Sequence, residues 1–169
     1  IASVSCNDTV MYIDDRWLYD QEDELPPVVE LDLATQRPEI SVIGSDVTIV
    51  ASGHASLLAR EVEKLLKCEN ISAEVIDVRV LNPFHAEEII ESVKKTKNLL
   101  VVDSGWISGG FSAEVIAKVV EQLPVDCLSN PPVRVALPDA PAPTSRVLEK
   151  AYYTSTDDVV KAVKKILNS

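Results

Sequence analysis

The chain has 169 residues, enough for one sizeable domain and an additional segment, and 46% of them are hydrophobic. Its formal net charge is −11, which repels the phosphates of nucleic acids and anionic lipids, so we expect neither nucleic acid nor membrane as a partner. No apolar stretch approaches the roughly 20 residues of a membrane helix, and no basic leader precedes an apolar run. These properties predict a soluble protein.

Three cysteines, Cys6, Cys68 and Cys127, are widely spaced and form no Cys-x-x-Cys pair. Such spacing is typical of neither a disulfide framework nor a zinc site, and it favours a reducing, intracellular compartment. The two histidines of the chain, His54 and His85, leave a histidine-based metal centre with few ligands. We therefore predict no metal site.

The first 38 residues keep no regular hydrophobic period. We predict a short buried strand at residues 9–13 and a turn of helix near residues 16–19, before acidic residues and the pair Pro26-Pro27. A single strand has no sheet of its own, and the chain starts with isoleucine rather than methionine. We interpret residues 1–38 as the end of a preceding domain followed by an extended linker.

From residue 39 onward, predicted strands and helices alternate. The predicted strands are 39–43, 47–51, 73–78, 99–102 and 133–136, and the predicted helices are 54–67, one opened by Asn82-Pro83, 111–123 and 156–167. Leu58, Val62, Leu65 and Leu66 form the predicted apolar face of the first helix. The alternation predicts a parallel sheet covered on both faces. The link between the first two strands is too short for a crossover, so the first should run antiparallel to the second.

Loops that follow parallel strands share one edge of a sheet, where α/β proteins bind ligands. Two glycine turns before helices lie at this predicted edge, where their free N–H groups suit an anion, and Arg79 could add positive charge. Alternatively, the glycines serve only the backbone angles, and Arg79 forms an ion pair with Asp77 or Asp103. The candidate anion-binding or interface residues are Gly53, His54, Arg79, Asp103, Gly109, Gly110 and Asp139.

The residues predict no active site. Each histidine lies near the start of a helix, where capping or exposure is commoner than catalysis. Neither a Ser-His-Asp nor a Cys-His arrangement is indicated, and the sequence has no G-x-x-x-x-G-K-[ST] or G-x-G-x-x-G motif. We predict no catalytic residue and no cofactor-binding residue in this chain.

Four segments together carry a resemblance to a known family. They are Gly44-Ser45-Asp46-Val47-Thr48-Ile49-Val50, Val75-Ile76-Asp77-Val78-Arg79-Val80-Leu81-Asn82-Pro83, the loop from Ser104-Gly105-Trp106 to Phe111-Ser112-Ala113-Glu114, and Pro138-Asp139-Ala140-Pro141-Ala142-Pro143. In this order, residues 39–167 resemble the transketolase C-terminal domain, in the form found in β subunits of pyruvate and branched-chain 2-oxo-acid dehydrogenases. Residues 9–27 similarly resemble the end of the pyrimidine-binding domain and the linker that precede it.

The resemblance implies a three-layer α/β/α sandwich with a five-stranded mixed sheet whose first strand is antiparallel. For the complete enzyme it implies thiamine-diphosphate-dependent decarboxylation of a 2-oxo acid, with Mg²⁺, and acyl transfer to lipoyl. The Gly-Asp-Gly…Asn segment that holds magnesium and diphosphate in the family is absent here, as is the catalytic glutamate of the pyrimidine domain. We therefore expect the isolated chain to be inactive.

What the resemblance assigns to this domain is assembly: contacts with the α subunit and a second β subunit, and docking of the acyltransferase core. The implied location is the cytoplasm, or the mitochondrial matrix in a eukaryote. Two alternatives stay open. One is a free-standing flavodoxin-like module that binds a nucleotide or another anion at the glycine edge. The other is the same domain from a transketolase or deoxyxylulose-phosphate synthase, where the arginine matching Arg79 helps to hold a substrate phosphate.

Overall fold

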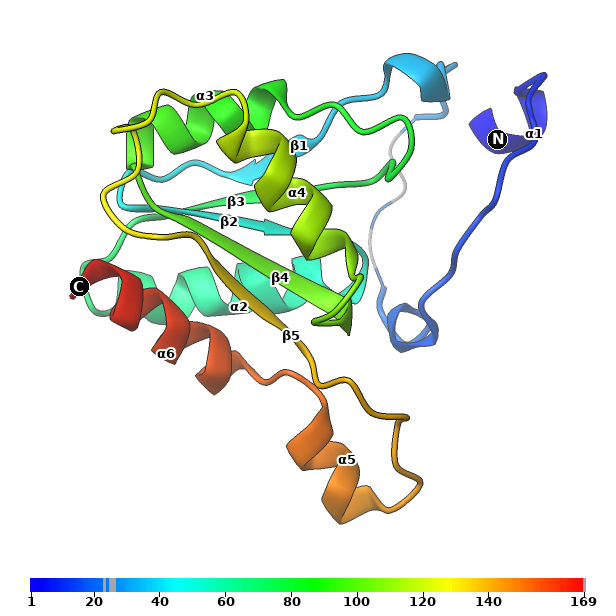
Figure 1. The fold of residues 1–169 in the computed structure, drawn as a ribbon. Helices are drawn as coiled ribbons and strands as arrows, with labels where there is room; N and C mark the ends of the chain where they lie inside the picture. The colour runs from blue at the N-terminus through cyan, green and yellow to red at the C-terminus, as the bar shows by residue number, and fades with distance from the viewer. Residues whose placement is uncertain (23, 25–26, 169) are drawn as a thin grey trace.

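The computed structural model describes residues 1–22, 24 and 27–168, and it has a five-stranded sheet at its centre (Figure 1). The strands are β1 (Glu39–Val42), β2 (Val47–Ala51), β3 (Ala73–Asp77), β4 (Leu99–Trp106) and β5 (Val133–Leu137). One face is covered by α2 (His54–Lys67) and α6 (Thr156–Leu167), the other by α3 (Glu87–Thr96) and α4 (Phe111–Val120). The predicted three-layer α/β/α sandwich is confirmed.

Shorter elements lie outside these layers. They are α1 (Ala2–Ser5), the 3₁₀ turns η1 (Arg16–Leu18) and η2 (Leu33–Thr35), and α5 (Arg146–Tyr152). The turn predicted near residues 16–19 is thus confirmed as η1, whereas α5 was not predicted, because a seven-residue helix with no buried residue has no hydrophobic period to reveal it. None of the helices in the described part of the chain is long and apolar enough to cross a membrane.

The strand order is β1-β3-β2-β4-β5, and it shows how the first strand joins the sheet. β1 pairs antiparallel with β3, with Glu39 opposite Asp77, and the other neighbouring pairs are parallel. The predicted antiparallel first strand is confirmed, but β3 lies between β1 and β2. The link from β1 to β2 passes directly over the start of β3, where a Cβ on Gly44 would collide with the backbone of Ala73. Glycine is required at this close approach.

Both faces of β2 and of the first four residues of β3 and β4 are buried, which explains why these segments are mainly apolar instead of alternating with polar residues. In β2, Ile49 faces α2 and α6, and Val50 faces α3 and α4, because successive side chains in a strand point to opposite faces. Thr48 is also fully buried, and its hydroxyl hydrogen-bonds to those of Ser92 and Thr96 on α3, at 2.7 Å each. The polar side chain therefore costs little and ties α3 to the sheet.

The helix α2 has the predicted bounds but a rotated buried face. Ala55, Ala59, Val62 and Leu66 are buried, whereas Leu65 is 48% exposed, so its predicted place on the buried face was wrong. The two alanines face the sheet, and their small side chains let the helix pack close to the strands. The prediction considered only large apolar residues, so it placed Leu65 on the buried face and left out the alanines.

Three other predictions also need correction. Residues 9–13 form no strand, and Met11, Tyr12 and Ile13 are exposed; within the described chain, no strand lies beside them to pair with. β4 continues to Trp106, four residues beyond the predicted end, because its last part pairs with β5. The helices α3 and α4 are shorter than predicted, since α3 begins only at Glu87 and α4 ends at Val120. Pro26, the first residue of the proline pair that we expect to break any helix, lies outside the described residues.

Candidate functional site

The seven candidate residues lie where β2, β3, β4 and β5 reach their carboxyl ends. Gly53 and His54 open α2, Arg79 follows β3, and Asp139 follows β5. Asp103, predicted to end a strand, instead lies inside β4, and Gly109 and Gly110 precede α4. Although the strands bring these residues to one edge, the side chains are held by partners within the chain.

The carboxylate of Asp103, from β4, binds at the N-terminus of α4. Its Oδ2 accepts a hydrogen bond from the backbone N–H of Ser112 at 2.7 Å, and its Oδ1 accepts one from Gly105 at 2.8 Å. A Cβ on Gly110 would lie 2.8 Å from Asp103 Oδ2 and would collide with the carbonyl oxygen of Trp106. The N–H group that the sequence offered to an external anion is therefore bound by the protein's own carboxylate.

The second glycine turn, at the start of α2, is exposed and lies beside the linker that begins at residue 14, which we call the connector. Gly53 has a positive φ of 57°, and a Cβ there would lie 3.9 Å from a carboxylate oxygen of Asp15. Beside it, the His54 ring meets the Trp17 ring edge-on, with centroids 4.7 Å apart, and Trp17 also contacts Tyr153 at 5.0 Å. The residues missed by the sequence reasoning here are aromatic, and they fasten η1 to the sheet edge.

Arg79 is paired across the sheet with β1. Its Nη1 lies 3.0 Å from Glu39 Oε2, and both side chains are about half exposed. Neither predicted partner, Asp77 nor Asp103, takes this bond. Asp77 instead accepts a hydrogen bond from Ser56, and its burial raises the pKa of its carboxyl group despite that bond and the nearby charge of Arg79. The arginine thus has a structural partner that adjacency in sequence could not reveal.

Asp139 joins the loop after β5 to the loop after β4. Its carboxylate accepts hydrogen bonds from the Ser108 hydroxyl at 2.6 Å and the Ser108 N–H at 3.1 Å, and these bonds lower its pKa. Nearby, Trp106 Nε1 donates to the Tyr152 hydroxyl at 3.0 Å, which donates to the carbonyl of Ala140 at 2.7 Å. This network holds α5 against both loops.

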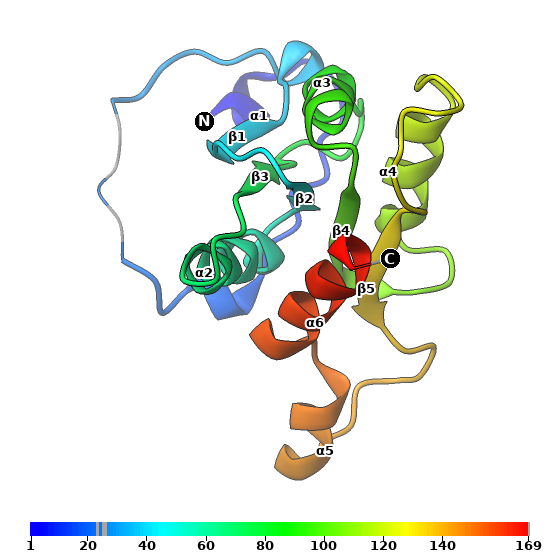
Figure 2. The ribbon, with the colours of Figure 1, turned by 90° about the vertical axis from the view of Figure 1, so that its left-hand side faces the viewer.

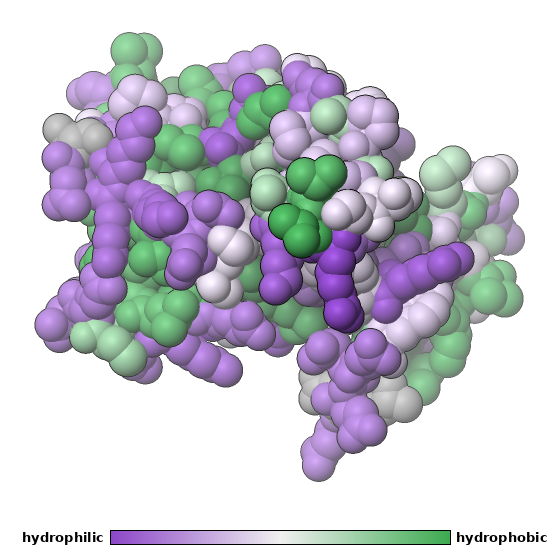
Figure 3. Space-filling view, turned by 90° about the horizontal axis from the view of Figure 1, so that it is seen from below, coloured by the Kyte–Doolittle hydropathy of each residue, from purple (hydrophilic) through white to green (hydrophobic). Residues whose placement is uncertain are grey.

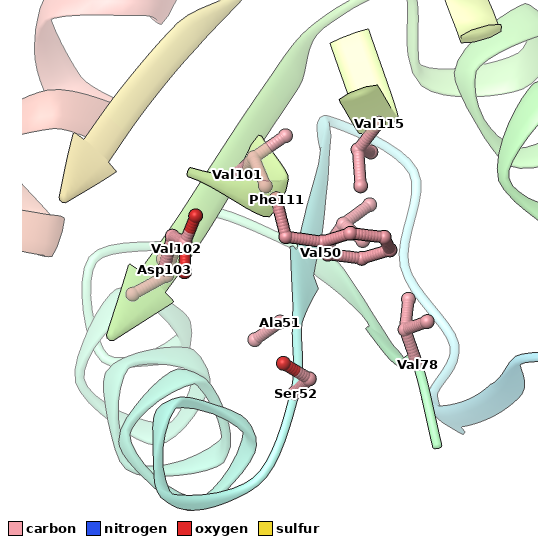
Figure 4. Close-up of a pocket in the computed structure, with 9 residues that line it drawn as sticks. All are labelled: Val50, Ala51, Ser52, Val78, Val101, Val102, Asp103, Phe111 and Val115. Atoms are coloured by element: carbon pink, nitrogen blue, oxygen red, sulfur yellow. The ribbon is translucent and has the colours of Figure 1, made fainter. Parts of the chain in front are cut away.

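A small cavity of about 10 Å³ lies beneath the edge, between β2, β4 and α4 (Figure 4). Its walls are mainly apolar, with Val50, Val78 and Phe111 among them, and Ser52 and Asp103 supply the side-chain oxygens. A cavity of this size holds about one water molecule, so it is too small for a nucleotide or a thiazolium ring.

The described residues do not fit thiamine diphosphate with magnesium. Within residues 1–22, 24 and 27–168, no group of three or more His, Cys, Asp or Glu side chains could hold a metal ion. A diphosphate also needs free N–H groups away from negative charge, but Asp103 binds the N–H of Ser112 at one turn and the Asp15 carboxylate lies beside Gly53 at the other. The edge is a structural junction of loops, connector and helix ends.

Comparison with known proteins agrees with the architecture. The family model "Transketolase, C-terminal domain" matches residues 37–159. Over 170 residues the chain is 35% identical to the mitochondrial pyruvate dehydrogenase E1 component subunit beta of Caenorhabditis elegans, covering 99% of this chain and 48% of the relative. The corresponding subunit of Rickettsia felis is 34% identical over 166 residues, with 98% and 50% covered. The chain thus spans about half the length of these curated relatives.

Solved structures show the same fold. The structure titled split gene transketolase, inactive beta4 tetramer, has a TM-score of 0.70 and 30% sequence identity, and the match covers 87% of this chain and 46% of that one. A 2-oxoglutarate:ferredoxin oxidoreductase from Magnetococcus marinus shares the fold alone, with a TM-score of 0.56 and 15% identity over 78% of this chain and 20% of its own. Sequence and fold agree: the chain belongs to the transketolase C-terminal domain family.

Proposed function

We propose that this chain serves as the C-terminal assembly domain of a thiamine-diphosphate-dependent 2-oxo-acid dehydrogenase β subunit. Its membership of the transketolase C-terminal domain family and its likeness to pyruvate dehydrogenase E1 β subunits support this proposal. In this role it contacts an α subunit and a second β subunit and helps to dock the acyltransferase core. Residues 1–38 are then the end of a pyrimidine-binding domain and a linker, and the location is the cytoplasm or the mitochondrial matrix.

The observation that carries the proposal is the exposed apolar surface of α5, a helix that packs none of its residues into the core of the domain. The helix α5 projects from the body of the domain (Figures 1 and 2), and none of its residues is buried. Val147 is 77% exposed and Leu148 is 57% exposed. Figure 3, seen from the side on which α5 projects, shows hydrophobic side chains standing among hydrophilic ones. Exposed apolar side chains grouped on a projecting helix are typical of a protein interface.

The chemistry of the complete enzyme belongs, in this proposal, to parts outside this chain. Thiamine diphosphate and Mg²⁺ would bind between the diphosphate and pyrimidine domains, and this chain supplies no catalytic residue. The Asp103 carboxylate at the start of α4 supports that division, because it already accepts the N–H of Ser112 and its negative charge disfavours a phosphate there.

The proposal is tested by light scattering of this chain mixed with the E1 α subunit of the same organism. We expect a complex, and we expect V147E/L148E to weaken it by about tenfold, because a charge in an apolar interface must be desolvated. Val125 is fully exposed on the loop after α4, so V125E is the matched control and should leave the complex intact. If the chain forms no complex, or if V125E weakens it equally, the assembly role is wrong.

A transketolase-type transferase remains the second candidate, favoured by the 30% identity to the split gene transketolase. In that case Arg79 should hold a substrate phosphate rather than stay with Glu39. A crystal soaked in sulfate separates the two, since an anion on Arg79 supports the transferase, and an unbroken Arg79–Glu39 pair supports the dehydrogenase subunit.

A further inference from the structure

A groove of about 440 Å³ lies between β1 and α3, away from the sheet edge described above. Ile40 of β1 forms part of its floor. Ile40 stands opposite Ile76, which is fully buried beneath α3 and α4, yet Ile40 itself is 44% exposed. The helix layer therefore stops short of the edge strand and leaves an apolar floor open.

The walls of the groove are acidic. Four glutamates line it, against the two cations Arg37 and Lys95. Lys95 is bound to the buried Glu74, and Arg37 is shared between Glu87 at 3.6 Å and Glu88 at 3.2 Å. Lys94 pairs with Glu91 at 2.7 Å, so the four glutamates meet three cations and one negative charge is left over, in a chain whose net charge is −11.

Two acceptor oxygens beside Arg37 are buried and have no hydrogen-bond donor among the described residues. They are Oε2 of Glu88 and Oε1 of Gln36. The other oxygen of Glu88 already accepts from Arg37. Of the two residues, Glu88 lines the groove, and its side chain is 25% exposed. Its carboxylate is therefore bonded through one oxygen only, which leaves it capacity for a further charge-assisted contact.

We propose that this groove binds an extended, basic segment of a partner protein. A Lys or Arg side chain matches it in both parts, since its aliphatic stem would cover Ile40 and its cationic end would reach Glu88 and Glu91. β1 is at the margin of the sheet (Figure 2), with no strand on its outer side within the described residues, so the backbone of the segment can lie along it. This inference rests on the groove and does not depend on the proposed function.

The test is a titration of the full ¹⁵N-labelled chain with a capped pentapeptide of alternating valine and arginine, followed by amide chemical shifts. We expect saturable shifts confined to β1 and to the first turns of α3. The variant E88Q/E91Q should weaken binding by about tenfold, because two charge-assisted contacts are lost. Glu61 and Glu121 are exposed on α2 and at the end of α4, so E61Q/E121Q removes the same charge elsewhere and should change affinity by less than about twofold.

A second variant separates the groove from general attraction to an acidic protein. I40S keeps every charge and removes the apolar floor, and we expect it to weaken peptide binding by about threefold to tenfold. Shifts scattered over the whole surface, or equal weakening by E88Q/E91Q and E61Q/E121Q, would overturn the proposal. So would an unchanged affinity in I40S.

Discussion

At the scale of single residues, the carboxylates of this chain take the places that an external anion was expected to take. Asp103 binds the N–H of Ser112 at the start of α4, and Asp139 binds Ser108. The sequence places a strand, glycines and a helix in the order that binds phosphates in many proteins. Here the N–H of Ser112 at the start of the helix is bound by a carboxylate of the same chain, that of Asp103, nine positions earlier.

Gly110 and Gly109 allow this arrangement to be tested. Gly110 lacks the space for a side chain, whereas Gly109 has the space but a backbone conformation that favours glycine. A Cβ at Gly110 would collide with the carbonyl of Trp106, so Gly110→Ala should destabilise the fold by about 3 kcal/mol. Gly109 has a φ of 71° and open space around it, so Gly109→Ala should cost about 1 kcal/mol. Urea unfolding of the two variants measures both, and equal losses would contradict the geometry.

Glu74 should make stability depend on pH. It is 1% exposed, and although its burial raises the pKa, hydrogen bonds from Lys95, Ser92 and Gly44 outweigh that effect and lower the pKa from its ordinary value of 4.5. A lowered pKa gives stability that is present above about pH 4.5 and lost as the pH falls through the folded-state pKa. Glu74→Gln should therefore cost about 1–3 kcal/mol at pH 7, and this difference should shrink on acidification.

The measurement for Glu74 is urea unfolding of both proteins between pH 3 and 7. Glu91→Gln is the control, because Glu91 is 72% exposed and pairs only with Lys94 on its own helix among the described residues. Its cost should stay below about 0.5 kcal/mol at every pH. A Glu74→Gln difference that grows as the pH falls would show that the sign is wrong.

At the scale of elements, the connector is attached where the sequence predicted only an extended linker. The Trp17 ring contacts His54 at the start of α2 and Tyr153 at the end of α5, and Tyr152 and Tyr153 also meet edge-on. Aromatic contacts of this kind contribute about 0.5–1.5 kcal/mol each. Trp17 is still 52% exposed, so the attachment is local rather than a second core.

Trp17→Ala should release the connector without unfolding the domain. Amide hydrogen exchange in residues 14–21 should become faster, because the ring contacts that hold η1 are lost, while exchange in β2 and β4 should stay slow. Mass spectrometry of deuterated peptides gives both rates. Tyr19 is 69% exposed and bonds to Asp14 within the connector, so Tyr19→Ala is the control and should leave His54 and Tyr153 peptides unchanged. If Trp17→Ala changes nothing, the contact does not hold the connector.

At the scale of the whole molecule, the sheet and its two helix layers form a domain that should fold without partners. Two apolar clusters, one on each side of the sheet, supply its core. We therefore expect a cooperative unfolding transition for the isolated chain, with residues 1–13 exchanging fastest, since their apolar side chains are exposed.

The isolated chain should bind neither thiamine diphosphate nor magnesium. Its described residues offer no cluster of metal ligands, and Asp103 occupies an N–H group at the start of α4. Calorimetric titration with both ligands should give no heat beyond dilution at cofactor concentrations up to about 1 mM. Inorganic diphosphate with magnesium is the control for phosphate binding alone, and micromolar affinity in either titration would reveal a site at the sheet edge.

The sequence by itself determined the layers of this protein and its family. The bounds of α2, β2 and α6 follow from local hydrophobic periods, and the short link around Gly44 predicts the direction of β1. These properties are local, because whether a residue faces the core is decided within a few neighbours along a helix or strand. Four short segments, read in order, were enough to recognise the transketolase C-terminal domain family.

Only the tertiary structure decided which residues meet. Arg79 binds Glu39, forty positions away, because β3 enters the sheet between β1 and β2. Trp17 reaches His54 and Tyr153 because the connector turns back over the sheet edge. No hydrophobic period encodes such pairs, since each depends on strand order and on loops that bring distant segments together. The residue types at the edge were therefore predictable, and their partners were not.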